Sequence, residues 1–144
     1  MTEVAFHFNA PDKVGYACRL LRKAVGSGAT VVVTGQAALL GELDAALWTF
    51  TALDFLPHCR EPGAPAAVLA ASPVVLTETP RAAPHHQVLV NLGQALPDGF
   101  ETFERLIEVV TADEDDRQRA RQRWKHYASR GYNIVRHDLG AEVQ

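Results

Sequence analysis

Apolar and polar positions in the first third of the chain predict a strand, a helix and a second strand. Glu3 to Phe8 is β-prone and ends at Asn9-Ala-Pro11, where Pro11 suits a first helical turn because its φ is already fixed. An amphipathic helix is predicted next, because apolar residues recur at steps of three and four: Val14, Ala17, Cys18, Leu21 and Val25. The glycines of Gly26-Ser-Gly28 are predicted to end it. Ala29 to Thr34 is a continuous β-branched run, typical of a strand buried on both faces.

The rest of the chain continues this alternation. Gln36 to Trp48 predicts a helix, whereas the prolines between Thr49 and Pro65 predict mostly loop, with one short buried piece at Phe55-Leu56. The later elements are predicted as strands over Val74–Thr77 and Gln87–Leu92, helices over Phe100–Val110 and Asp113–Arg130, and a last strand over Tyr132–Val135. A strand–helix–strand order implies parallel pairing and a sheet covered on both faces. We therefore expect a single doubly wound α/β domain over residues 1–144, with a mostly parallel sheet and a Rossmann-like topology.

Composition narrows the class of protein without identifying it. The 144 residues are 47% hydrophobic and 22% charged, with a formal net charge of −3, which argues against a surface built all round to bind a polyanion. The two cysteines, Cys18 and Cys59, lack any paired spacing, so a reducing compartment is the simple interpretation. The N-terminus lacks the pattern of a signal peptide, and no apolar run is long enough for a membrane span, so we expect a cytoplasmic protein.

The common catalytic and cofactor motifs are missing. The first predicted strand–helix turn is Asn9-Ala-Pro-Asp12, which has no glycine for close approach to a pyrophosphate, and Asp12 would repel one. No serine lies in a G-x-S-x-G turn. We expect neither catalytic residues nor a cofactor. A small nucleotide- or metal-binding α/β enzyme with the same fold stays as the alternative.

Histidines and acidic residues raise the question of a metal. His58-Cys59 and His85-His86 are adjacent pairs, unlike the spacing usual for zinc ligands, so no metal is expected, although the sequence leaves open whether these four residues bind one. The acidic cluster Asp113-Glu-Asp-Asp116 opens a predicted helix, where negative charge complements the macrodipole and side chains cap free amides.

Basic residues concentrate in the C-terminal part of the chain. Residues 117–136 hold seven of the 14 Lys and Arg residues and no Asp or Glu. At about 100° per residue, one helix face carries Arg117, Ala120, Arg121, Trp124, Tyr127 and Ala128, and the opposite side carries Arg119, Arg123, His126 and Arg130. Helical geometry leaves two interpretations open: an anion-binding surface beside an apolar patch, or core anchors with arginines at their rim. A basic helix could also contact a nucleic acid backbone, although the acidic run beside it would oppose a long polyanion.

Several segments together resemble the chi subunit family of bacterial DNA polymerase III. They are Asp44-Ala-Ala-Leu-Trp48 with Phe55-Leu-Pro-His58, the run Arg121-Gln-Arg-Trp-Lys-His-Tyr127 followed by Gly131-Tyr-Asn133, and the strand Pro73-Val-Val-Leu-Thr77. Each segment alone is weakly specific, but their order and spacing agree over essentially the whole chain. The resemblance implies a non-catalytic accessory subunit of the clamp loader. It also implies two partners: the psi subunit, and the acidic C-terminal tail of single-stranded DNA-binding protein, which ends in phenylalanine.

The same resemblance suggests which residues would hold that tail. Arg121 matches the tail-binding arginine of the family, Arg117 a basic position usually occupied by lysine, and Trp124 an aromatic position usually occupied by tyrosine. Val110 matches an apolar position at the pocket wall, and Trp48 and Phe55 match aromatic residues near the same surface. Strong direct binding of nucleic acid or of a membrane is not expected.

Overall fold

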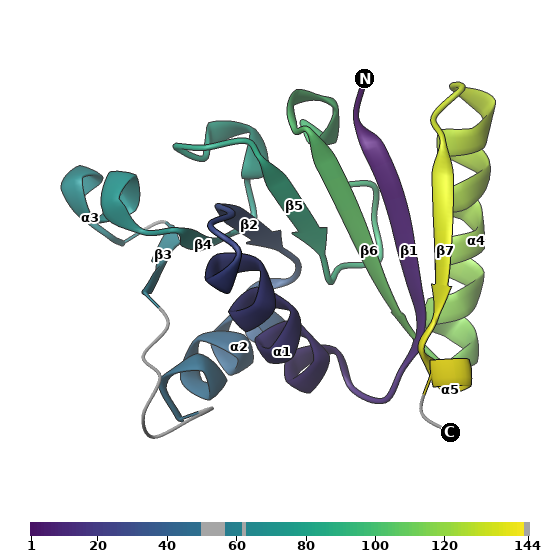
Figure 1. Cartoon of the computed structure of the whole chain (residues 1–144), viewed down its shortest axis with the longest axis horizontal. Helices are drawn as coiled ribbons and strands as arrows, with labels where there is room; N and C mark the ends of the chain where they lie inside the picture. Colours follow the sequence, from purple (N-terminus) through teal and green to yellow (C-terminus); the bar gives the residue numbers. More distant parts are fainter. Residues whose placement is uncertain (50–56, 62, 143–144) are drawn as a thin grey trace.

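The elements of the computed structural model follow one another in an α/β order, and residues 1–49, 57–61 and 63–142 are described (Figure 1). The strands are β1 Glu3–Ala10, β2 Val31–Thr34, β3 His58–Glu61, β4 Val74–Thr77, β5 Val88–Asn91, β6 Arg105–Thr111 and β7 Ile134–Asp138. The helices are α1 Lys13–Gly26, α2 Ala37–Thr49, α3 Ala66–Ala71, α4 Glu114–Ser129 and α5 Leu139–Glu142, with short 3₁₀ turns at η1 Pro80–Ala82 and η2 Phe100–Thr102.

One seven-stranded sheet has the order β3-β4-β2-β5-β6-β1-β7, and every ladder described in it is parallel. Helices α1 and α2 pack on one face, against a core that includes Leu21, Leu43 and Val33. Helix α4 packs on the other face, where its Tyr127 meets Phe6 and Leu106 of the sheet (Figure 1). The predicted α/β class, with helices on both faces, is confirmed.

The predicted helix over Phe100–Val110 is wrong. Residues 105–111 form β6, which lies in the middle of the sheet between β5 and β1. Leu106 and Val110 face the α4 side, Ile107 and Val109 face the α1 side, and all four are buried. A strand covered on both faces is apolar at almost every position, so it also matches a three- and four-residue spacing by chance.

The stretch predicted as mostly loop contains a strand. His58–Glu61 forms β3, which pairs with β4 and, among the described residues, stands at the edge of the sheet. Its polar composition gives little β signal, because the edge of a sheet does not require an apolar run. The short piece expected at Phe55-Leu56 lies outside the described residues. The last strand also begins later than predicted, at Ile134.

Candidate functional site

Helix α4 begins as the acidic cluster predicts. The carboxylate of Asp113 caps the helix by accepting a hydrogen bond from the Asp116 amide at 3.1 Å. Asp116 is itself buried and accepts from Lys13 Nζ at 2.9 Å and from the Thr111 amide at 2.8 Å. Burial opposes ionisation of Asp116, but the hydrogen bonds from Thr111 and Lys13 outweigh it and lower its pKa. The start of α4 is therefore tied to both β6 and α1.

The buried residues of α4 are Asp116, Ala120, Arg123 and Tyr127, and only two of them belong to the helix face that the sequence singled out. Ala120 and Tyr127 are fully buried, as core anchors would be. Arg123, which helical rotation placed roughly opposite these two residues, is also buried, with only 3% of its surface exposed. Trp124 lies between core and solvent, with its ring 5.0 Å from Phe6 and 6.1 Å from Phe8. The buried stripe of α4 thus runs through Arg123, and the arginines at 117 and 121 stay exposed.

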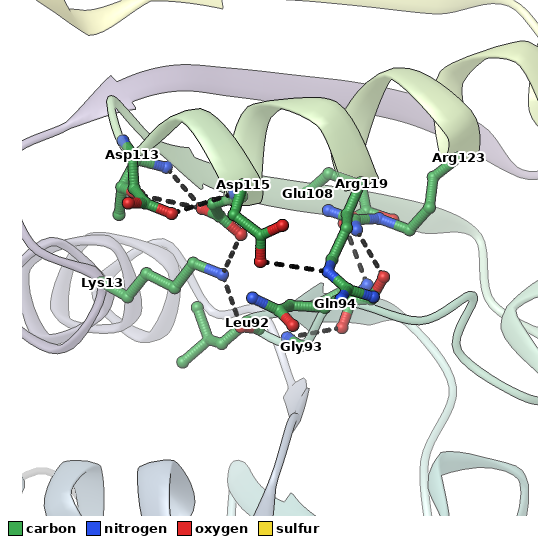
Figure 2. Close-up of polar contacts among 12 residues, drawn as sticks. Lys13, Leu92, Gly93, Gln94, Glu108, Asp113, Asp115, Arg119 and Arg123 are labelled. Atoms are coloured by element: carbon green, nitrogen blue, oxygen red, sulfur yellow. Dashed lines mark hydrogen bonds and ion pairs between the residues drawn. The ribbon is translucent and has the colours of Figure 1, made fainter.

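A buried polar network receives the Arg123 guanidinium. Its Nε lies 3.1 Å from Oε1 of Glu108, a charge contact whose angle is poor for a hydrogen bond, and its Nη1 donates to the Gln94 carbonyl at 2.8 Å (Figure 2). The Tyr127 hydroxyl donates to Glu108 Oε2 at 2.6 Å, and Asn91 Nδ2 donates to Oε1 at 2.9 Å. Burial raises the pKa of Glu108, and these donors counter the shift. The network fixes how far α4 is rotated on the sheet.

A surface pocket of about 390 Å³ opens beside the exposed side of α4. Three elements line it: β1 with Phe8 and Asn9, α4 with Arg117, Arg121, Trp124 and Lys125, and β7 with Arg136. These elements are far apart in sequence and meet because β1 lies between β6 and β7, under α4.

The β1 wall of the pocket is shaped by a bulge. The register between β1 and β6 shifts between His7 and Ala10, and Asn9 adopts a left-handed backbone with φ of 62°. Asparagine tolerates this conformation better than most residues. Its side-chain amide donates to Asp138 at 2.8 Å, at the end of β7. Bulges of this kind commonly redirect a side chain next to a binding site.

The pocket is strongly positive. Four cations and no carboxylate line it. Among the described residues, an ion pair is formed by only one of the four: Arg121 lies 3.7 Å from Glu114, and both side chains are more than half exposed, so the pair contributes little. A larger hollow of about 700 Å³ elsewhere is lined by Glu3, Glu101 and Glu104 together with Arg105, and its mixed charges favour no anion. The pocket on α4 therefore suits an anionic ligand with an apolar or aromatic part.

The structure brings together three of the six predicted site residues, Arg117, Arg121 and Trp124. Val110 is fully buried in the core beneath α4 and does not line the pocket. Trp48 is 60% exposed near the end of α2, with its ring 5.2 Å from that of His58 in β3, at the opposite edge of the sheet from β7 (Figure 1). Phe55 lies outside the described residues.

Sequence reasoning missed Phe8, Asn9, Lys125 and Arg136 as pocket residues. Lys125 and Arg136 belong to the basic run, which was a usable signal. Nothing local pointed to Phe8 or Asn9, because their place depends on the pairing of β1 with β7, about 130 residues later in the chain.

The histidines of the predicted pairs have other partners. His58 Nε2 lies 2.9 Å from Asp44, and His85 Nε2 lies 3.1 Å from the Ser72 carbonyl. His86 contacts Thr102 at 2.7 Å and stacks on Phe103. Within the described parts of the chain, no three His, Cys, Asp or Glu side chains gather as metal ligands. Across the same residues, no helix has both the length and the apolar character of a membrane span.

Comparison with known proteins agrees with the resemblance in the sequence. The sequence model of one family, described as DNA polymerase III chi subunit, HolC, matches residues 1–135. A protein of Pseudomonas aeruginosa named DNA polymerase III subunit chi is 31% identical over 144 aligned residues, covering 96% of this chain and 98% of that protein. A protein of Haemophilus influenzae with the same name is 27% identical over 126 residues, covering 86% of this chain and 85% of that protein. The chain therefore belongs to the DNA polymerase III chi subunit family, a family of replication accessory subunits.

Proposed function

We propose that the pocket on α4 binds the C-terminal tail of single-stranded DNA-binding protein, and that the chain links this tail to the clamp loader through the psi subunit. The chain would work in the cytoplasm and have no catalytic activity of its own. The observation that carries the proposal is the pocket's composition, two aromatic rings surrounded by four cations. A peptide that ends in phenylalanine with a free carboxylate offers a matching ring and matching charge.

Two interactions would supply most of the affinity. The terminal phenyl ring would pack against Phe8 and Trp124, and burial of such a ring contributes about 1.5–3 kcal/mol. The terminal carboxylate would pair with Arg121, and a hydrogen bond to a charged group adds about 1.5–3 kcal/mol. After the costs of association, these contacts support roughly micromolar affinity, near −8 kcal/mol.

The lining residues favour binding over catalysis. The pocket presents arginine, lysine, asparagine and aromatic side chains, and none of its lining residues is a carboxylate, histidine, cysteine or serine. Most enzymes take their nucleophile or general base from those groups; lysine can also serve, and Lys125 is the one lysine that lines the pocket. This supports an adaptor role over the alternative of a small α/β enzyme.

Direct binding of single-stranded DNA is the rival that the same composition favours. Aromatic side chains, on which bases stack, and cations form the usual protein surface for single strands. However, Glu114 and Asp115 are exposed in the first turn of α4, next to Arg117 and Arg121, and would repel a long polyanion. A short peptide end with few charges avoids that repulsion.

Calorimetric titration with a synthetic tail peptide tests the proposal. We expect wild-type protein to bind with micromolar affinity, and Arg121→Ala or amidation of the terminal carboxylate to weaken binding about tenfold or more, as expected for loss of one charged hydrogen bond. Arg119→Ala is the matched control, since Arg119 is exposed on the same helix and pairs with Asp115 outside the pocket. No binding by the wild type, or equal binding by the amide, would contradict the proposal.

A titration with a single-stranded oligonucleotide separates the rival. Tight binding with a steep loss of affinity at higher salt would favour DNA as the ligand.

The link through psi, which rests on family membership, is tested by co-elution of the chain with the psi subunit in size-exclusion chromatography. Separate elution at micromolar concentrations would contradict it.

A further inference from the structure

Arg136 reaches the pocket from β7, on the same face of the sheet that α4 covers. It lies on β7, an edge strand that pairs with β1 alone, and it pairs in register with Phe6. Its guanidinium carbon lies 5.1 Å from the centre of the Phe8 ring, a distance at which a cation is attracted to an aromatic face. The guanidinium is therefore held at the pocket's edge before any ligand arrives.

We propose that Arg136 binds a second carboxylate of the ligand, an acidic side chain located upstream of the terminal phenylalanine. This inference rests on the proposed tail binding and concerns which peptides the pocket prefers. Arg121 on α4 and Arg136 on β7 contribute cations from two different elements, and Phe8 and Trp124 contribute the rings, whose centres are 6.1 Å apart. When the terminal phenyl ring packs on Phe8 and Trp124, the terminal carboxylate can pair with Arg121. The acidic side chain of a preceding residue can then pair with Arg136.

The geometry of the ligand fits this division. An extended peptide advances about 3.3 Å per residue, so a terminal carboxylate and an upstream side chain separate by several ångströms. One guanidinium cannot hold both groups across that separation, whereas two guanidinium groups on different walls can. The pocket would then recognise its ligand by two carboxylates and one aromatic ring.

Arg136 is available for this role. Among the described residues, no carboxylate forms an ion pair with it, and its interaction is with the Phe8 ring. The nearby acid on the same strand, Asp138, accepts hydrogen bonds from Asn9 and from the Gly140 amide. The Asn9–Asp138 contact also ties the β1 bulge to β7, which places Phe8 beneath Arg136.

A double-mutant cycle between protein and peptide tests the inference. Wild type and Arg136→Gln are titrated with the tail peptide, with versions in which each aspartate is replaced singly by asparagine, and with the C-terminal amide. We expect Arg136→Gln to weaken binding of the unmodified peptide about fivefold, the size of a typical coupling between contacting charges. One aspartate replacement should cost a similar factor on wild type and almost nothing on Arg136→Gln. The amide should cost the same on both proteins, because the terminal carboxylate pairs with Arg121.

Arg130→Gln is the control, since it removes the same charge from the C-terminal end of α4, outside the pocket. It should weaken all peptides alike and less than twofold, as a distant screened charge does. Unchanged affinity of Arg136→Gln, or an equal loss for every peptide, would overturn the role of Arg136 and leave tail binding standing. Failure of the wild type to bind any peptide would overturn tail binding itself, and with it this inference.

Discussion

At the scale of single residues, the buried pair Arg123 and Glu108 has the largest consequences for stability. Arg123 is 3% exposed and Glu108 is fully buried, so each charge depends on the other and on the donors around it. A buried charge left without its partner is costly, whereas an exposed ion pair contributes little. The Arg123 side chain therefore stabilises the fold, whereas its neighbours on α4, Arg121 and Trp124, line the pocket.

Arg123→Met should destabilise the protein by about 3–5 kcal/mol, because it leaves the Glu108 carboxylate buried without its cation. Urea denaturation followed by circular dichroism measures the change. Arg119→Met is the control, since Arg119 is half exposed on the same helix, and it should change stability by about 0.5 kcal/mol or less. A loss below about 1 kcal/mol for Arg123→Met would mean that the ion pair is dispensable.

His7 should make stability depend on pH. Burial, and then the neighbouring His137 and Arg105, lower its pKa to about 4, and its ring also contacts the Tyr16 hydroxyl from α1. An unfolded histidine has a pKa near 6.5, so as pH falls the unfolded chain takes up this proton first. The stability that neutral His7 allows is therefore present above pH 6.5 and decreases as pH falls toward 4.

We expect the wild type to lose about 1 kcal/mol through His7 between pH 7.5 and 5.0, after allowance for partial exposure. His7→Gln should lose that much less over the same range, because glutamine does not titrate. Thermal melts at the two pH values measure the difference. Parallel losses for both proteins would show that His7 is not the group responsible.

At the scale of elements, α4 is the piece that carries the pocket, and its start is held from three directions. Asp113 caps its first turn, Thr111 at the end of β6 binds Asp116, and Lys13 from α1 bridges Asp116 to the Leu92 carbonyl at 2.8 Å (Figure 2). Acidic side chains at this end also complement the helix dipole. The acidic cluster and the basic run thus have separate roles on one helix.

Asp113→Ala should cost about 1 kcal/mol of stability, because it removes the hydrogen bond to the Asp116 amide. Glu114→Ala removes the same charge from the same turn without removing a cap, and it should cost about 0.5 kcal/mol or less. Chemical denaturation of the two variants separates capping from charge. Equal losses would mean that the dipole alone accounts for the effect.

At the scale of the whole molecule, the parallel sheet places the pocket with Trp124 and the exposed Trp48 at opposite edges. Trp124 and the pocket lie over β1 and β7, whereas Trp48 lies beside β3 at the other end of the strand order. A short peptide bound in the pocket as proposed would not reach Trp48. The resemblance in the sequence had grouped the two tryptophans near one surface, and the sheet separates them.

Trp48→Ala should therefore change tail-peptide affinity less than about twofold, since an exposed residue far from the ligand is energetically almost independent of it. Titration beside Arg121→Ala, which should lose tenfold or more, provides the comparison. A similar loss for both variants would mean that the tail extends across the molecule.

Local patterns in the sequence determined most of the elements. The β-branched runs of β2, β4 and β5 and the apolar steps of α1 and α2 are strong short-range signals, and each was predicted correctly. The shared helix face of the basic and aromatic residues of α4 was also predictable, because a helix places residues three and four apart on one side. Arg117, Arg121 and Trp124 follow from that rule, and the structure places them together.

Tertiary structure alone decided what each pattern meant in context. Residues 105–111 became a strand because β5 and β1 take up its backbone hydrogen bonds from both sides, and Arg123 became buried because Glu108 lies beneath it. Phe8 and Arg136 reached the pocket through the pairing of β1 with β7, while Val110 was covered and Trp48 was carried to the far edge. Burial and strand register depend on partners far away in the chain, and no local spacing of residues encodes them.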